Sequence, residues 1–409
     1  MRKLSKLKYL LKKDSIIKPS QLLVGGAEAA AIFGPLLLKV KTTKKFVVGP
    51  LAPTPDSLEI EKEEILQRAD FLCSKLVTTP EKALHTYPKL LGDYYGPQWS
   101  IYAAVMTVAA LSNIARLWPE EKAKALTRME KLVEIVMSEE FQRYDALQWG
   151  EYPLDTLDGD KDHMTYLSLL AWVMSNYRLA GGSDRFDALY KEICHTLNRR
   201  MLKRKNYNMK SFPRTPLFSA DMLVVLVALK NYGRIFGDDR YEESIENWLC
   251  RSRTVWIDNR TGLLVSTLRR NDAKGKVRGD YSGLNCFWLT LVDPDYAFEQ
   301  YGLMKRYLGK YDGMFKGIRQ YVDRSPAFAF DPDAGPIVDG LSPSGTAFAI
   351  GSATFFNDWD FRTMLLTTAA RGGGDVRKNG MRHYKLGEFS LIGEAATLAM
   401  RTNKQELWD

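Results

Sequence analysis

Residues 217–236 read LFSADMLVVLVALKNYGRIF, and this stretch decides the fold class. From Met222 to Leu229 every side chain is apolar, so the stretch has no helix face that suits water. The next stretch, 238–257, opens with acids and carries its charges on one face, which is typical of a helix with one side in solvent. A fully buried helix followed by an amphipathic one predicts two layers of helices.

The same two kinds of helix alternate along the chain from about residue 57. Helices with one charged face are predicted at 58–77, 118–137, 184–203, 238–257, 295–309 and 359–371, and apolar helices at 98–116, 163–180, 217–236, 281–292, 344–356 and 388–402. Alternation of this kind predicts an all-α fold, an (α/α)6 toroid or six-hairpin barrel, whose apolar helices form the inner ring. We expect the barrel over residues 57–409 and a separate arm over residues 1–56.

The net positive charge of the chain is confined to this arm. The net charge is +9, and residues 1–55 account for all of it, so the barrel is neutral and offers no basic surface for nucleic acid. The four Cys and four His lack CxxC, HxxxH and HExxH spacing, which excludes a disulfide framework and the common zinc sites. No glycine-rich phosphate loop follows a strand, so we expect neither a metal nor a cofactor.

The arm has a pattern of its own. Leu4, Leu7 and Leu10 recur at helical spacing among lysines, which predicts a basic amphipathic helix. We therefore expect a cytoplasmic protein that contacts a membrane surface through residues 1–45. Two other interpretations stay open: helices that pack on the barrel, and a signal or membrane-spanning segment near 22–38.

In such a toroid the inner helices all run in one direction, so the loops that enter them meet at one mouth, where the helix N-termini supply partial positive charge. These loops are rich in carboxylates, Tyr and Trp. The candidate acid–base residues are Asp93, Asp162, His163, Asp221 and Asp280. The candidate substrate-binding residues are Tyr94, Tyr95, Trp99, Trp149, Glu151, Tyr152, Phe218, Arg278, Tyr281 and Asp339.

Some of these residues also have structural interpretations. Asp162 and His163 are placed to cap the helix that follows them, and Arg278 and Asp280 are placed to form an ion pair. Asp221 is the most informative candidate, because it lies one turn into a strongly apolar helix. A buried carboxylate must be paired or protonated, and either state suits acid–base chemistry.

Short stretches between residues 97 and 310 form a pattern of packing and turn residues. They include Trp99-Ser100-Ile101-Tyr102, 162–177, Gly181 to Phe186, Phe212-Pro213, Gly237 to Tyr241, Trp248-Leu249, Ile257 to Gly262, 293–295 and Gln300-Tyr301. The pattern resembles the linalool dehydratase/isomerase-like (α/α)6 proteins. This resemblance implies a cavity for a largely apolar alcohol or alkene, in which side chains move protons without a cofactor. The catalytic cysteines of that family fall near Ser211 and Ala220 here, so thiol chemistry does not carry over.

Three functions follow from these observations. The main hypothesis is a cofactor-independent lyase or isomerase, with dehydratase- or cyclase-like acid–base chemistry on a hydrophobic terpenoid or lipid-like substrate, because the apolar arm would collect such a substrate at a membrane. The second is a carbohydrate-active six-hairpin enzyme, a glycoside hydrolase, lyase or epimerase, in which Glu151 pairs with Asp221 or Asp280. The third is a non-catalytic binding or scaffold protein. Assembly into a homo-oligomer is compatible with each.

Overall fold

The computed structural model describes residues 55–87, 92–268, 276–323 and 325–408, without the side chains of residues 55, 56 and 92–95. The arm therefore lies outside the described residues, and its helices and its membrane contact stay predictions.

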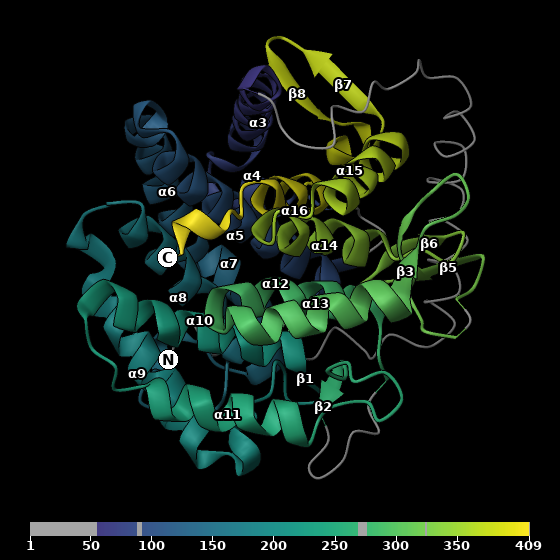
Figure 1. Cartoon of the computed structure of the whole chain (residues 1–409). Coiled ribbons are helices and arrows are strands. Elements are labelled where there is room, and N and C mark those ends of the chain that lie inside the picture. The colour runs from purple at the N-terminus through teal and green to yellow at the C-terminus, as the bar shows by residue number, and fades with distance from the viewer. Residues whose placement is uncertain (1–54, 88–91, 269–275, 324, 409) are drawn as a thin grey trace.

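The described chain forms a closed double ring of helices (Figure 1). Each inner helix contacts the next one, and the last inner helix returns to the first. The inner ring consists of α5 (Gly92–Leu117), α8 (Met164–Leu179), α10 (Ser219–Phe236), α12 (Gly279–Val292), α14 (Pro343–Phe355) and α16 (Ile392–Arg401). The outer ring consists of α3 (Pro55–Leu76), α6 (Lys122–Met137), α9 (Asp187–Lys203), α11 (Glu242–Thr254), α13 (Pro294–Leu308) and α15 (Trp359–Gly373). The predicted (α/α)6 toroid is confirmed.

Short elements connect these helices, and apart from β2, which lies within a short strand expected at 263–268, the sequence did not predict them. Two are the α-helices α4 (Pro80–Leu84) and α7 (Glu139–Trp149). The 3-10 turns are η3 (Pro119–Glu121), η4 (Leu154–Thr156), η5 (Asp184–Phe186), η6 (Lys205–Tyr207), η7 (Lys385–Glu388) and η8 (Gln405–Leu407). Four antiparallel strand pairs are β1 (Leu217–Phe218) with β2 (Thr267–Leu268), β3 (Gly309–Lys310) with β4 (Gly317–Ile318), β5 (Phe328–Asp331) with β6 (Gly335–Val338), and β7 (Asp375–Lys378) with β8 (Met381–Tyr384).

Three inner helices begin later than the sequence predicted: α16 begins at Ile392, after η7, and α10 and α8 are delayed for local reasons. Leu217 and Phe218 pair with Leu268 and Thr267 as strand β1, so α10 begins at Ser219. His163 adopts a left-handed backbone conformation (φ 45°), so α8 begins at Met164. Both positions lie at helix N-termini, where the chain turns into the inner ring.

The inner ring is the core of the molecule. In α8 every residue from Met164 to Tyr177 is buried. The segment Gly96–Leu117 of α5 is long and apolar enough to cross a membrane, but most of it is buried inside the ring. Gly283 allows α12 and α14 to approach closely, because a Cβ atom there would lie 2.7 Å from the carbonyl oxygen of Gly345. This close packing fixes the first turns of α12 and α14 beside each other.

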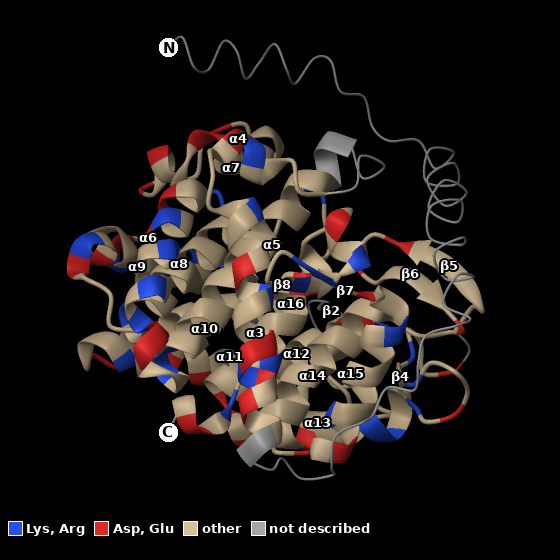
Figure 2. Cartoon of the chain, turned by 90° about the horizontal axis from the view of Figure 1, so that it is seen from above, with Lys and Arg blue, Asp and Glu red and all other residues tan. Residues whose placement is uncertain are grey.

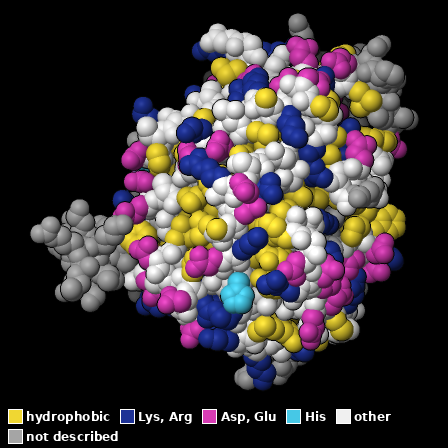
Figure 3. Space-filling view, turned by 90° about the vertical axis from the view of Figure 1, so that its left-hand side faces the viewer, with side chains coloured by type: hydrophobic (Ala, Val, Ile, Leu, Met, Phe, Trp, Pro, Cys, Tyr) yellow, Lys and Arg dark blue, Asp and Glu magenta, His cyan; other side chains and the backbone are white. Residues whose placement is uncertain are grey.

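The surface carries charges of both signs. Lys and Arg alternate with Asp and Glu over the outer helices (Figure 2). The face shown in Figure 3 likewise mixes basic, acidic and scattered apolar side chains. A network of ion pairs joins α3 to α16 and β7. Arg68 donates hydrogen bonds to Glu394 at 2.7 Å and to Asp375 at 2.8 Å.

Candidate functional site

A cavity of about 460 Å³ lies where the inner helices begin. Its walls come from the first half of α5, the first turns of α10, α12, α14 and α16, and the β5–β6 hairpin. Most of the lining is apolar or aromatic. The acids in it are Asp221, Asp280 and Asp333, and the aromatic residues are Trp99, Tyr102, Phe212, Phe218, Tyr281, Phe330 and Phe348.

Asp221 lies in the first turn of α10 and lines the cavity. Burial raises the pKa of its carboxyl group from 3.8 to about 6, and a hydrogen bond donated by the Ser211 hydroxyl partly opposes this rise. A carboxyl group with a pKa of this value can exchange protons near neutral pH. The pKa of Asp221 therefore suits the role of general acid or base that the sequence predicts for it.

Asp333 lies in the turn between β5 and β6. About half of its side chain (47%) is accessible, and it lines the cavity, so this accessible half is open to a ligand. Burial among cavity groups raises its pKa to about 7, and the charge of Asp331 adds to the rise. The hydroxyl of Tyr281 donates a long hydrogen bond of 3.4 Å to Asp333 Oδ2. Asp333 is thus a second carboxyl group that exchanges protons near neutral pH.

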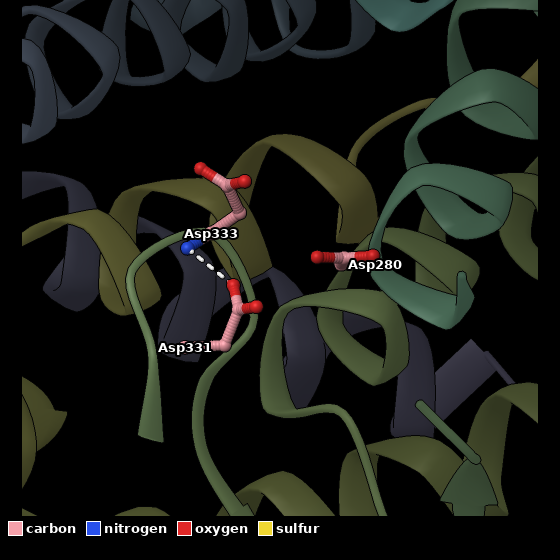
Figure 4. A group of neighbouring side chains, drawn as sticks. All are labelled: Asp280, Asp331 and Asp333. Atoms are coloured by element: carbon pink, nitrogen blue, oxygen red, sulfur yellow. Dashed lines mark hydrogen bonds between the residues drawn. The ribbon is translucent and has the colours of Figure 1, made fainter. Parts of the chain in front are cut away.

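Arg278 ties the β5–β6 turn to the start of α12. Its Nη2 atom lies 2.5 Å from Asp280 Oδ2, 2.8 Å from Asp331 Oδ1 and 3.6 Å from Asp333 Oδ2. Asp331 Oδ1 also accepts hydrogen bonds from the backbone N–H groups of Asp333 (2.9 Å) and Ala334 (3.1 Å). Figure 4 shows how the turn with Asp331 and Asp333 faces Asp280. The turn that holds Asp333 is therefore fixed by one guanidinium group.

The three carboxylates around Arg278 resemble a metal site in their spacing. Oxygen atoms of Asp280, Asp331 and Asp333 lie within 4.8 Å of one another. The guanidinium group already supplies the positive charge between them, and its interactions with these acids raise the pKa of Arg278 against the effect of burial. The arrangement is that of an ion-pair cluster that holds the turn in place.

Two tyrosines complete the centre of the cavity. Burial raises the pKa of Tyr102 and Tyr281 well above 10, and the charges of Asp221 and Asp333 act on both in the same direction. Both hydroxyls therefore stay protonated and can donate hydrogen bonds to a ligand. The ring of Phe218 stacks on Tyr281 with centroids 5.2 Å apart, which fixes this wall of the cavity.

The structure brings together about a third of the residues that the sequence analysis named. Those that line the cavity are Trp99, Phe218, Asp221, Asp280 and Tyr281, and Arg278 lies beside them. The side chains of Asp93, Tyr94 and Tyr95 lie outside the described residues. Asp162 instead binds Arg204 at 2.7 Å and the backbone N–H of Lys210 at 2.8 Å, so it fixes a loop.

Four further predicted residues lie around α7, away from the cavity lining. His163 Nδ1 lies 2.5 Å from Asp145 Oδ2, and its Nε2 lies 3.3 Å from Glu151 Oε1. Trp149 packs on the His163 ring with centroids 5.2 Å apart. Tyr152 donates to Glu139 at 3.0 Å. This group differs from the predicted mouth because α7, which the sequence analysis did not predict, encloses His163.

The remaining predicted residue, Asp339, is exposed and pairs with Lys310 at 2.9 Å. The sequence analysis missed Asp331 and Asp333, and it treated Ser211 and Tyr102 only as positions of a resemblance. The available signal was the run Asp331-Pro332-Asp333-Ala334-Gly335, whose composition is that of a tight turn between two strands. This run precedes an inner helix, as do the loops in which the other candidate residues were predicted.

Comparison with known proteins bears on the fold. The sequence matches no protein-family model and no curated protein. Among solved structures, the chain is similar to a glycoside hydrolase from family 105 of C. acetobutylicum, with 12% identity, a TM-score of 0.50, and coverage of 83% of this chain and 99% of that one. It is also similar to an unsaturated glucuronyl hydrolase specific for heparin (11% identity, TM-score 0.52, coverage 86% and 97%) and to a polysaccharide lyase (12%, 0.50, 85% and 97%).

These comparisons correct the sequence analysis. The three solved structures named above are hydrolases and lyases of carbohydrates by their names. The resemblance to the linalool dehydratase/isomerase-like proteins is therefore wrong, and so is the prediction of a lyase or isomerase for terpenoid or lipid-like substrates. The matching stretches were packing and turn positions, which unrelated proteins of one fold share.

Proposed function

We propose that this chain is a carbohydrate-active enzyme, a glycoside hydrolase that uses Asp221 and Asp333 as its acid–base pair. One observation carries the proposal: two carboxyl groups with pKa values raised to about 6 and about 7 line the same aromatic cavity. The fold neighbours agree in class, because their names denote hydrolases and lyases of sugars. Glu151, which the sequence analysis paired with Asp221, does not line this cavity, and Asp333 takes its place.

The two raised pKa values suit hydrolysis of a glycosidic bond. The acidic member protonates the leaving oxygen, and the ionised member activates the attacking water or stabilises the developing positive charge on the sugar. The two carboxyl groups influence each other, so their titration belongs to the pair. Between about pH 6 and pH 7 the pair holds one proton, which is the state that the reaction needs.

The rest of the cavity suits a sugar ring. The carbon–hydrogen faces of a sugar pack on aromatic side chains, and Trp99, Phe218 and Phe348 supply such surfaces. Tyr102 and Tyr281 supply hydroxyl donors for the ring oxygens. The volume of about 460 Å³ lies in the usual range of roughly 300–1,000 Å³ for small-ligand sites.

The test is turnover of an oligosaccharide panel by the wild type and by Asp333→Asn. We expect cleavage of at least one neutral or amine-bearing glycoside, and a loss in kcat of about 10²- to 10⁴-fold in the variant. Mass analysis of the products separates hydrolysis, which adds water, from elimination, which leaves a carbon–carbon double bond. Elimination would reassign the chain as a lyase.

Asp339→Asn is the matched control for this experiment. It makes the same chemical change at an exposed residue outside the cavity, and asparagine tolerates the positive φ of 52° at that position. We expect wild-type activity from it. Binding of sugars without any turnover by the wild type would instead support a binding protein. If the wild type neither binds nor turns over any sugar of the panel, the proposal is refuted.

A further inference from the structure

The charged groups around the cavity are unbalanced. Among the described residues that line it, three are aspartates and none is Lys, Arg or His. Asp331 adds a fourth acid just behind the wall, and among the described residues Arg278 contacts Asp280, Asp331 and Asp333 with one positive charge. A ligand that enters therefore meets negative charge.

The charge of Arg278 is already compensated by the acids around it. Its guanidinium group is shared by Asp280, Asp331 and Asp333, at 2.5, 2.8 and 3.6 Å. It also lies over the ring of Tyr281, 5.1 Å from the centroid. Arg278 does not line the cavity, and its one positive charge faces three acids, so it offers a substrate carboxylate little net attraction.

An ammonium group would meet the opposite situation. Asp221 and Asp333 line the cavity, and in their ionised forms they attract a positive charge. The aromatic faces of Trp99 and Tyr102 also favour a cation through their negative ring faces. Carboxylates and aromatic rings together form a site that suits an amine.

We propose that the sugar unit bound in this cavity carries no carboxylate, and that an amine-bearing unit binds better than its neutral counterpart. This inference rests on the proposed function and adds the charge class of the substrate. It separates this chain from the neighbour whose name denotes a glucuronyl group, because such a group carries a carboxylate.

The test compares three methyl glycosides: the glucoside, the glucosaminide, which differs from it only by an amine at C2, and the glucuronide, which differs from it only by a carboxylate at C6. Their dissociation constants are measured by calorimetry near neutral pH, and turnover is measured on the matching aryl glycosides. We expect affinity to fall from amine to neutral to carboxylate, by about tenfold in all, and the difference to shrink as salt is added. Tightest binding of the glucuronide would overturn the inference.

Asp331→Asn sharpens the test. The variant keeps an amide oxygen that can accept from the N–H groups of Asp333 and Ala334. It removes one of the negative charges that compensate the charge of Arg278. We expect the disadvantage of the glucuronide against the glucoside to shrink by about twofold to threefold, with Asp339→Asn unchanged as control. No change with Asp331→Asn would mean that Arg278 does not set the charge preference, and would count against the inference.

The outcomes separate the two proposals. Turnover with a preference for the glucuronide would leave the glycoside hydrolase standing and overturn the charge class. Binding in the expected order without turnover would support the charge class and overturn the hydrolase. If none of the three glycosides is bound or turned over, both proposals are overturned.

Discussion

Asp221, which is half-buried, and Asp145, which is fully buried, are two carboxyl groups near the beginnings of inner helices, and desolvation raises the pKa of both. Asp221 lines a cavity and accepts one hydrogen bond from the Ser211 hydroxyl. Asp145 is fully buried and pairs with His163, which is also fully buried. The comparison teaches that a raised pKa marks a functional group only where a ligand can reach it. We therefore propose a chemical role for Asp221 and a structural role for Asp145.

Asp221→Asn should reduce activity about as strongly as Asp333→Asn does. We expect kcat on the cleaved glycoside to fall by about 10³-fold, because one half of the acid–base pair loses its exchangeable proton. The fold should survive, since an amide oxygen can still accept from Ser211. Steady-state kinetics and thermal unfolding of the same preparation provide the two readouts. A variant with near-wild-type kcat would remove Asp221 from the mechanism.

Asp145→Ala should show the reverse pattern. The variant leaves His163 buried without its partner at 2.5 Å, and loss of one partner from a buried pair costs about 3 kcal/mol of unfolding free energy. We expect urea denaturation to report this loss, while kcat per folded molecule stays within about twofold of the wild type. A selective loss of kcat with full stability would place the His163 group in the catalytic machinery and end the distinction drawn above.

The same contrast explains what the sequence could and could not predict. The toroid was predictable because burial on all sides leaves a clear mark, as in the run from Met222 to Leu229. Asp221 was predictable because a charge inside such a run is conspicuous. His163 was placed at the mouth because α7 was not predicted, and α7 supplies Asp145.

The site was less predictable where it depends on contacts between distant segments. Asp333 lies in the three-residue turn between β5 and β6, and only the folded chain brings it to Arg278, 55 positions earlier in the numbering, and to the wall formed by α10. Turn composition predicts a bend but not what the bend faces. The family resemblance failed for a related reason, because shared turn positions report the fold and not the site.

The pH dependence of stability gives a third, smaller test of Asp221. Burial raises the pKa of this group from 3.8 to about 6, so the folded state binds its proton more tightly than the unfolded chain does. Its contribution is fully present below about pH 4 and is lost as the pH rises through about 6. Relative to the wild type, Asp221→Asn should therefore gain about 1–2 kcal/mol of unfolding free energy between about pH 4 and pH 8. Urea denaturation at the two pH values measures this difference, and a pH-independent difference would contradict the raised pKa.

Glu151→Gln should give the smallest effect, although the sequence analysis named Glu151 as a catalytic partner. Glu151 pairs with Lys161 at 2.7 Å, and these two side chains are 25% and 45% accessible. Its contact with His163 is long, at 3.3 Å, and an amide oxygen can preserve it. We expect a loss of about 0.5 kcal/mol or less in unfolding free energy and no change in kcat, because a solvent-accessible ion pair contributes little. A tenfold loss of kcat in this variant would show that the reaction reaches beyond the cavity to α7, and the separation of the two carboxyl groups into chemistry and stability would no longer hold.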